Sequence, residues 1–290
     1  MIFKKGLVLS PEEKKTPLAK YYDIPLTPVE PLRQQIIDAC PIDPKLAIPI
    51  ENMLDFLKPT GYEKVEYGYC MMKDGTGFLA NYTTYPNCSP EMIKWWLRWL
   101  NVYPKSIPKG HGNLKYKIWC PPGHYDHDFI NGKDKTDGVW TVESIDFGEE
   151  DLPFATIRHP INLRDFGLTE QREKEFKEGG CWVDPAIVTA HRPVPYHEPG
   201  MVHERIPGTR ISLSISRMSP LGYMEFRMHN YYGYTIENGK IVKEKKTPPE
   251  MLTEKHLRKV LVHATVEAQQ LSKFLPQLYA EYHNKPDDVL

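Results

Sequence analysis

Apolar residues recur with helical spacing near the end of the chain, in the segment KVLVHATVEAQQLSKFLPQLYAEY at 259–282. At about 100° per residue, the residues on one arc of this predicted helix are apolar. They are Leu257, Val260, Leu261, Ala264, Ala268, Leu271 and Leu275, with Phe274 at the edge. The capping-box pattern at 247–250 predicts the start of the helix, and Pro276 predicts its end.

Two polar residues interrupt this arc. Glu267 falls inside it, and His263 lies at its rim one turn away, so both project from the same side of the helix. A carboxylate that faces a core is costly unless it is paired, protonated or bound to a metal. A solvated or salt-bridged surface pair gives the same spacing. The apolar flanks favour the buried alternative.

The middle of the chain has the composition of strands. Segments rich in β-branched and aromatic residues alternate with turn signals at 113–120, 139–147, 154–161, 181–194, 200–219 and 223–242. A hairpin is predicted around Asp74-Gly75 and a tight turn at Asn238-Gly239. A tryptophan-rich helix should begin after Ser89. A curved antiparallel sheet followed by one long helix is expected, which is an α+β fold with a cavity between helix and sheet.

The first 60 residues differ from the rest because prolines separate short helical patterns. The sequence predicts a helical extension at 1–60 and a main domain at 61–290. The extension holds none of the residues suited to chemistry. It is therefore expected to serve assembly.

Composition narrows the class of protein. The 290 residues are 40% hydrophobic and 26% charged, which is ordinary for a globular protein, and the net charge of −1 gives no case for nucleic acid or an anionic membrane. No apolar run reaches the length of a membrane span, and the start lacks a signal-peptide pattern. Five widely spaced cysteines, without a Cys-x-x-Cys pair, indicate reduced thiols, a cytoplasmic location and no cysteine zinc site.

Histidines and carboxylates that could bind a metal occur in two further segments. His124 and His127 stand with Asp126 and Asp128 after the turn at 121–123. Glu143 lies in a predicted strand, where alternation places it beside Thr141 and Ile145. Two imidazoles and two carboxylates make a sound ligand set for Zn²⁺, with Fe²⁺ or Mn²⁺ less favoured. The spacing alone is less specific than HExxH, and a polar surface loop explains it as well.

Four segments together resemble the 2,4-diacetylphloroglucinol hydrolase and phloretin hydrolase family. They are MIKWWLRWL, YKIWCPPGH, MVHERIPGTRISLSISRM and HATVEAQQLSKFLPQLY, in the family's order. The resemblance implies a helix-grip fold of the birch-pollen-allergen type, with an N-terminal extension used in dimerisation. It further implies a zinc ion held by two histidines and two glutamates, and hydrolysis of the C–C bond between an acyl group and a phloroglucinol ring.

Carried over to this chain, the resemblance implies particular roles. The metal ligands would be His124, Glu143, His263 and Glu267, with Glu149 and Glu150 as alternatives for the strand glutamate. Residues near the substrate would be Tyr116, His127, His203 and Tyr223. His127 stands where the family can have asparagine, which leaves its role open. Two other functions stay open: a carrier of an apolar ligand without catalysis, and a mononuclear iron oxygenase.

Overall fold

The computed structural model describes residues 9–39, 41–121, 123–147, 153–194 and 196–289. Within these residues, eight strands form one antiparallel sheet in the order β1-β2-β8-β7-β6-β5-β4-β3. The strands are β1 (Gly68–Met71), β2 (Gly77–Tyr85), β3 (His124–Phe129), β4 (Val139–Glu143), β5 (Phe154–Pro160), β6 (Trp182–His191), β7 (Arg205–Met218) and β8 (Met224–Tyr232). A separate hairpin joins β9 (Tyr234–Glu237) to β10 (Lys240–Lys243).

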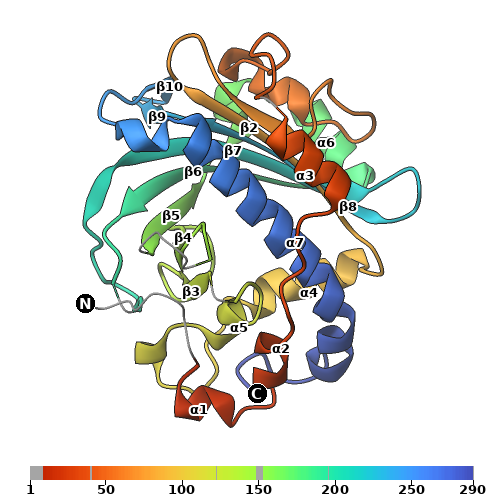
Figure 1. Ribbon diagram of the computed structural model, residues 1–290, viewed down its shortest axis with the longest axis vertical. Coiled ribbons are helices and arrows are strands. Elements are labelled where there is room, and N and C mark those ends of the chain that lie inside the picture. The colour runs from red at the N-terminus through yellow and green to blue at the C-terminus, as the bar shows by residue number, and fades with distance from the viewer. Residues whose placement is uncertain (1–8, 40, 122, 148–152, 195, 290) are drawn as a thin grey trace.

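The sheet curves around one long helix, α7 (Glu254–Tyr282), which crosses it diagonally (Figure 1). The other helices are α1 (Pro11–Lys14), α2 (Ala19–Tyr22), α3 (Pro31–Asp38), α4 (Pro90–Trp99), α5 (Leu114–Lys117) and α6 (Glu170–Glu178). Short 3₁₀ turns are η1 (Ile50–Phe56), η2 (Lys109–His111), η3 (Leu163–Phe166) and η4 (Pro249–Met251). The expected α+β class, with a large curved antiparallel sheet and a C-terminal helix, is confirmed.

Alternation gives the sheet two distinct faces. The inner face, toward α7, carries Thr141, Glu143, Arg210 and Asn230 among others. On the outer face, Ile211, Leu213 and Ile215 of β7 pack under η1 and α6 in an apolar cluster that includes Phe56 and Phe176. Because side chains on a strand alternate with a period of two, every residue is assigned to one face by its register.

Helix α7 begins later and ends later than the sequence predicts. Thr253 caps it by accepting a hydrogen bond from the backbone N–H of His256 at 3.1 Å, whereas Thr247 lies before η4. Pro276 lies inside the helix, since Leu278 and Tyr282 beyond it are buried. Burying two large side chains stabilises the last turns by about 3–6 kcal/mol, enough to offset a proline cost of about 3 kcal/mol.

The segment 113–120 is helical where a strand is expected. Asn113 caps α5 by accepting a hydrogen bond from the N–H of Lys115. The ammonium group of Lys115 donates to the carbonyls of Trp99 and Val102, and Lys117 pairs with Glu13 at 2.6 Å. These two lysines are almost fully buried, and the tertiary contacts they make are absent from the local sequence pattern.

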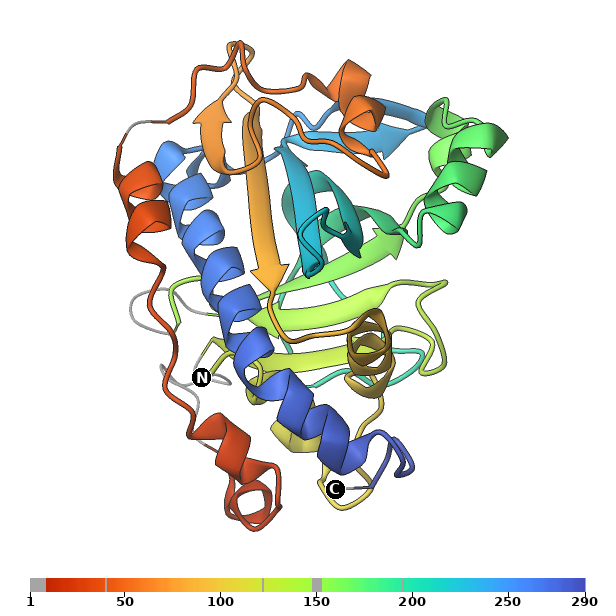
Figure 2. The same ribbon diagram turned by 90° about the vertical axis from the view of Figure 1, so that its right-hand side faces the viewer.

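The described part of the first 57 residues packs on α7 and on the sheet, and Figure 2 shows α3 beside α7. Leu18 and Tyr21 are buried against α4 and α7, and Phe56 and Leu57 are buried on the outer face of the sheet. The expected extension therefore supplies part of the hydrophobic core. None of the described helices combines the length and apolar character that crossing a bilayer requires.

Candidate metal centre

A cavity of about 580 Å³ lies between α7 and the inner face of the sheet. This volume is within the usual range for sites that enclose a small organic molecule. Of the residues that the sequence singles out, those that line the cavity are Tyr116, His127, Glu143, His263 and Glu267.

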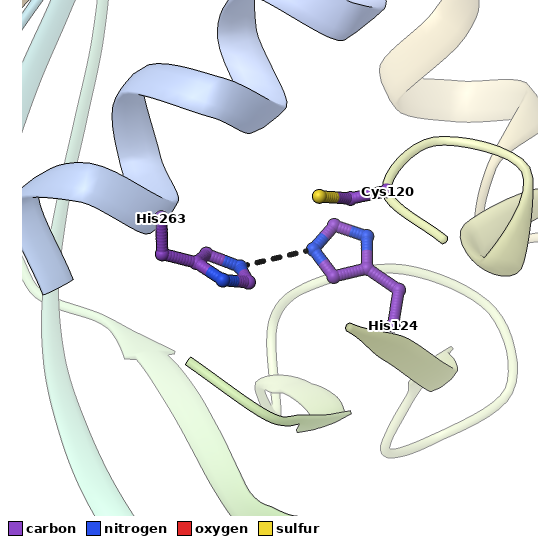
Figure 3. Close-up of side chains that lie close together, drawn as sticks. All are labelled: Cys120, His124 and His263. Carbon is purple, nitrogen blue, oxygen red and sulfur yellow. Dashed lines mark hydrogen bonds between the residues drawn. The ribbon is translucent and has the colours of Figure 1, made fainter. Parts of the chain in front are cut away.

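His124 and His263 meet at one end of this cavity. His124 opens β3, and His263 projects from α7, yet their Nε2 atoms are 3.3 Å apart (Figure 3). Both imidazoles are buried. The two histidines are 139 residues apart in sequence, so the fold and not local spacing creates the pair.

The two predicted carboxylates face this imidazole pair. Oε2 of Glu267 is 3.4 Å from Nε2 of His124 and 3.8 Å from Nε2 of His263. Oε2 of Glu143 is 4.0 Å and 3.9 Å from the same two atoms. Glu143 reaches the site because it pairs with His124 across β3 and β4. Ligand atoms about 2.1 Å from a zinc ion lie roughly 3.3 Å apart in a tetrahedron, so these distances are close to a ligand shell.

Cys120 approaches the same imidazoles, although the sequence gives no sign of a cysteine metal site. Its Sγ lies with the ligand atoms of His124 and His263 within a mutual 4.8 Å (Figure 3). A turn brings it there, because the N–H of His124 donates to the carbonyl of Cys120 at 3.1 Å. A cysteine ligand was excluded on the sequence because the pattern sought was a Cys-x-x-Cys pair and not one cysteine four residues before a histidine. The two imidazoles could therefore bind a metal together with the carboxylates of Glu143 and Glu267, or together with the thiol of Cys120.

The electrostatics of the centre follow from burial. Burial lowers the pKa of His124 to about 4 and also lowers the pKa of His263, so both imidazoles are neutral at pH 7. Burial raises the pKa of Glu267 to about 7. Burial acts in the same direction on Glu143, but the two histidines and a hydrogen bond from Tyr116 outweigh it and lower its pKa. Neutral imidazoles beside carboxylates are the protonation states that bind a divalent cation.

Aromatic residues fix the positions of the candidate ligands. The hydroxyl of Tyr116 donates to Oε2 of Glu143 at 2.8 Å, and its ring stacks on His124 with centroids 3.9 Å apart. The carbonyl of Tyr116 lies 3.3 Å from Nδ1 of His124, which leaves Nε2 facing the centre. The indole N–H of Trp119 donates to the carbonyl of Glu267 at 2.8 Å. Such outer contacts orient metal ligands.

His127 lies beside this group on the cavity wall. Its ring stacks on Tyr116 with centroids 4.9 Å apart, and its Nδ1 is 3.3 Å from the hydroxyl of Thr141. Burial lowers the pKa of His127 to about 3. At neutral pH it is a hydrogen-bonding group and not a proton donor.

His203 does not line the cavity, contrary to the expectation that it is a pocket histidine. It stacks on Trp140 at 3.9 Å and its Nε2 is 2.7 Å from Nδ1 of His197. Trp140 alternates with Thr141 and Glu143 on β4, so it points to the outer face. The register of β4 thus puts His203 on the far side of the sheet.

Tyr223 is likewise outside the cavity. It stands at the turn between β7 and β8, and its hydroxyl is 3.5 Å from that of Tyr82 beside the buried Glu225 on the outer face. Glu149 and Glu150, the alternatives to Glu143, lie outside the described residues.

The combination of a curved antiparallel sheet, a crossing helix and a His/Glu cluster in a cavity defines an α+β protein with a candidate metal-binding site. Residues 48–155 match the DAPG hydrolase PhiG domain family. A phloretin hydrolase of Eubacterium ramulus is 36% identical over 114 residues. The family resemblance found in the sequence is confirmed for the matched part of the chain.

The match has a definite extent. The aligned residues cover 39% of this chain and 39% of that phloretin hydrolase. The family region includes Tyr116, Cys120, His124 and Glu143. His263 and Glu267 lie beyond it on α7. The family match therefore gives no information on these two residues, and only the structure brings them close to His124 and Glu143.

Proposed function

We propose that this protein is a zinc-dependent hydrolase that cleaves the C–C bond between an acyl group and a polyhydroxylated aromatic ring. The observation that carries the proposal is the approach of His124, Glu143, His263 and Glu267 to within 3.3–4.0 Å at the cavity wall. The family match supplies the class of reaction. The fold is proposed to be the helix-grip type.

The donor set fits a divalent metal. Two neutral imidazoles and two carboxylates would leave Zn²⁺ with a net charge near zero, which suits a buried site. When bound, the metal would polarise an acyl carbonyl and lower the pKa of water. Cys120 offers an alternative to one carboxylate. Fe²⁺ and Mn²⁺ are less favoured than zinc.

The other steps of the hydrolysis are assigned to side chains of the cavity. Hydrolysis first puts a proton on the ring carbon that bears the acyl group, which gives the keto tautomer of the ring. Water then adds to the acyl carbon and the acyl–ring bond breaks, so that its electron pair passes into the ring and onto the ring oxygens as a phenolate. Burial raises the pKa of Glu267 to about 7 in the metal-free site, and a bound cation would lower it and hold Glu267 as a carboxylate ligand. Tyr116 orients Glu143 through their 2.8 Å hydrogen bond. His127 is placed to hydrogen-bond the substrate. His203 and Tyr223 take no part.

Residues 1–60 are proposed to form a dimerisation arm of a cytoplasmic homodimer. Deleting the arm would remove buried residues such as Leu18 and Phe56, so substitution is a cleaner test. Leu32 and Ile36 of α3 are 70% and 42% exposed and one helical turn apart. Leu32→Glu with Ile36→Glu should give a folded monomer by light scattering. A dimer that persists in this variant would contradict contact through α3.

The function is tested with a panel of acylphloroglucinols and phloretin under anaerobic conditions, with metal analysis of the purified protein. We expect release of the free ring and the acid, with about one zinc per chain. Turnover that requires Fe(II) and dioxygen would indicate an oxygenase. A protein without stoichiometric metal or turnover would indicate a carrier of an apolar ligand.

A further inference from the structure

The wall of the cavity formed by β7 and β8 carries an arginine without a polar partner. Arg210 lines the cavity, and its Nε is buried without a hydrogen-bond partner. Its guanidinium makes no hydrogen bond or ion pair with any residue in the described part of the chain. It lies 5.6 Å from the centroid of the Tyr232 ring, and its charge also favours the ionised forms of Glu143 and Glu267 across the cavity. A half-buried guanidinium with five donors is rarely left in this state.

Two neighbours of Arg210, Asn230 and Tyr232, also have a buried polar atom without a hydrogen-bond partner among the described residues. Tyr232 is the cross-strand partner of Arg210, and Asn230 is the partner of Ser212 one step along the inner face. Asn230 and Tyr232 line the cavity, and both are about 2% exposed or less. The Oδ1 of Asn230 and the hydroxyl of Tyr232 are buried with no partner among the described residues. We call Arg210, Asn230 and Tyr232 the β7–β8 platform.

Arg158, a second arginine that lines the same cavity, differs from Arg210 because its guanidinium has hydrogen-bond partners in the protein. It donates to the side chain of Asp184 at 2.9 Å and to the hydroxyl of Ser212 at 3.0 Å. The sheet has thus neutralised Arg158 with its own carboxylate. Arg210 makes no hydrogen bond or ion pair with a carboxylate of the described residues, so its donors are open to a ligand.

We propose that the β7–β8 platform binds the ring of the substrate as a phenolate, with Arg210 donating to an ionised ring oxygen and Asn230 accepting from a neighbouring ring hydroxyl. This inference rests on the proposed function and names the substrate feature that it selects. The electron pair of the broken C–C bond passes to the ring and is shared with the ring oxygens. A fixed guanidinium at those oxygens stabilises that charge where it develops.

Asn230 decides between a phenolate and a carboxylate. In the orientation in which Nδ2 of Asn230 donates to Sδ of Met228 at 3.5 Å, a carboxylate ligand, which presents acceptors only, would leave the Oδ1 of Asn230 buried and unpaired. A polyhydroxylated ring offers an ionised oxygen and a hydroxyl donor together. The platform is therefore complementary to a ring with at least two hydroxyl groups.

The test uses phloroglucinol as the probe and the metal-loaded protein. Binding should shift the ultraviolet absorption of phloroglucinol to that of its anion at a pH where the free compound is neutral. Arg210→Gln should abolish the shift and weaken binding about 10- to 100-fold, the loss expected for hydrogen bonds to a charged group. Arg210→Lys should restore part of the shift. Metal content should be unchanged in both variants, and circular dichroism should show the wild-type fold.

Arg205→Gln is the matched control, since Arg205 lies on the same strand but pairs with Glu244 at 3.6 Å outside the cavity. It should bind the probe as the wild type does. An unchanged shift and affinity in folded Arg210→Gln would overturn the proposal. Benzoate binding as tightly as phloroglucinol, and depending on Arg210, would also overturn it by showing a carboxylate site. A probe that binds with the shift to a wild-type protein unable to hydrolyse any acylphloroglucinol would refute the hydrolase and retain the platform.

Discussion

The two faces of the sheet each bury a cluster of charged residues, but only on the outer face is each carboxylate paired with an arginine. On the outer face, Arg217 pairs with Glu225 at 2.6 Å with both side chains at most 1% exposed, and Arg227 pairs with Glu66 at 2.6 Å. The hydroxyl of Tyr82 also donates to Glu225 at 3.1 Å. Each of these two carboxylates has an arginine and hydrogen bonds from the protein itself.

On the inner face, Glu143 and Glu267 meet imidazoles that burial keeps neutral. No described residue supplies a lysine or arginine within ion-pair distance of either carboxylate. Burying a charge without a partner costs several kcal/mol. The carboxylates of the outer cluster have arginine partners, whereas those of the inner cluster lack a cation at ion-pair distance among the described residues. Both clusters contain buried carboxylates, but a carboxylate paired with an arginine indicates a structural role, whereas a carboxylate without a cation indicates a site for a ligand.

The largest effect should come from removing an imidazole of the inner cluster. His263→Ala should lower hydrolysis by at least about 10³-fold, equivalent to about 4 kcal/mol, and should release the bound metal. Kinetics and elemental analysis measure both effects. His283→Ala, at the end of the same helix, is the control because its Nδ1 only contacts the carbonyl of Tyr279. Normal turnover and metal content in His263→Ala would remove this residue from the site.

The reverse pattern is expected on the outer face. Glu225→Gln leaves the buried guanidinium of Arg217 without its counter-charge, which should lower the free energy of unfolding by about 3–5 kcal/mol. Urea denaturation measures this loss. The folded fraction should keep its metal and its specific activity. If Glu225→Gln lost metal and kept its stability, the outer cluster would not be a purely structural network.

The choice between Glu143 and Cys120 sharpens the description of the inner cluster. Glu143→Gln should weaken metal binding roughly 100-fold and keep the fold, because it removes one anionic ligand. Cys120→Ser should bind metal almost as the wild type does, since burial raises the pKa of this thiol well above its usual range and disfavours the thiolate. Competition with a chelator measures both affinities. The opposite order would assign the ligand to Cys120.

Glu149 and Glu150 complete this series. Both follow Gly148 in a predicted turn, where a solvated charge is cheap. Glu149→Gln and Glu150→Gln should therefore change metal affinity and turnover little. A large loss in either variant would mean that the strand glutamate is not the second carboxylate ligand.

The sequence was sufficient to predict α7 and the sheet because both patterns are local. The apolar arc of α7 has a helical period, and Glu267 stands out within it. The family resemblance predicts that His124, Glu143, His263 and Glu267 bind one metal, and that role stays a prediction. Two of these residues, His124 and His263, come from segments 139 residues apart. Their order along the chain could not supply the distances.

The errors in sequence interpretation come from tertiary contacts. Lys115 and Lys117 make α5 stable through partners at Trp99 and Glu13, which no local window contains. His203 was assigned to the cavity although the register of β4 places its contact, Trp140, on the outer face. A shift of one residue in register reverses the face, and sequence patterns fix boundaries less finely than that.

The pH dependence of stability tests the inner cluster in the metal-free protein. Burial raises the pKa of Glu267 from its ordinary value of 4.5 to about 7, so the folded chain holds this proton more tightly than the unfolded chain does. That stabilisation is complete below about pH 4.5 and is lost as the pH rises through about 7. Glu267→Gln keeps a neutral side chain at every pH. With a chelator present, the variant should match the wild type near pH 4.5 and exceed its free energy of unfolding by about 3 kcal/mol at pH 8. Added zinc should stabilise the wild type more than the variant and reverse the order at pH 8. Equal stability of the two proteins at pH 8 without metal would show that Glu267 is already satisfied by the protein, as Glu225 is on the outer face.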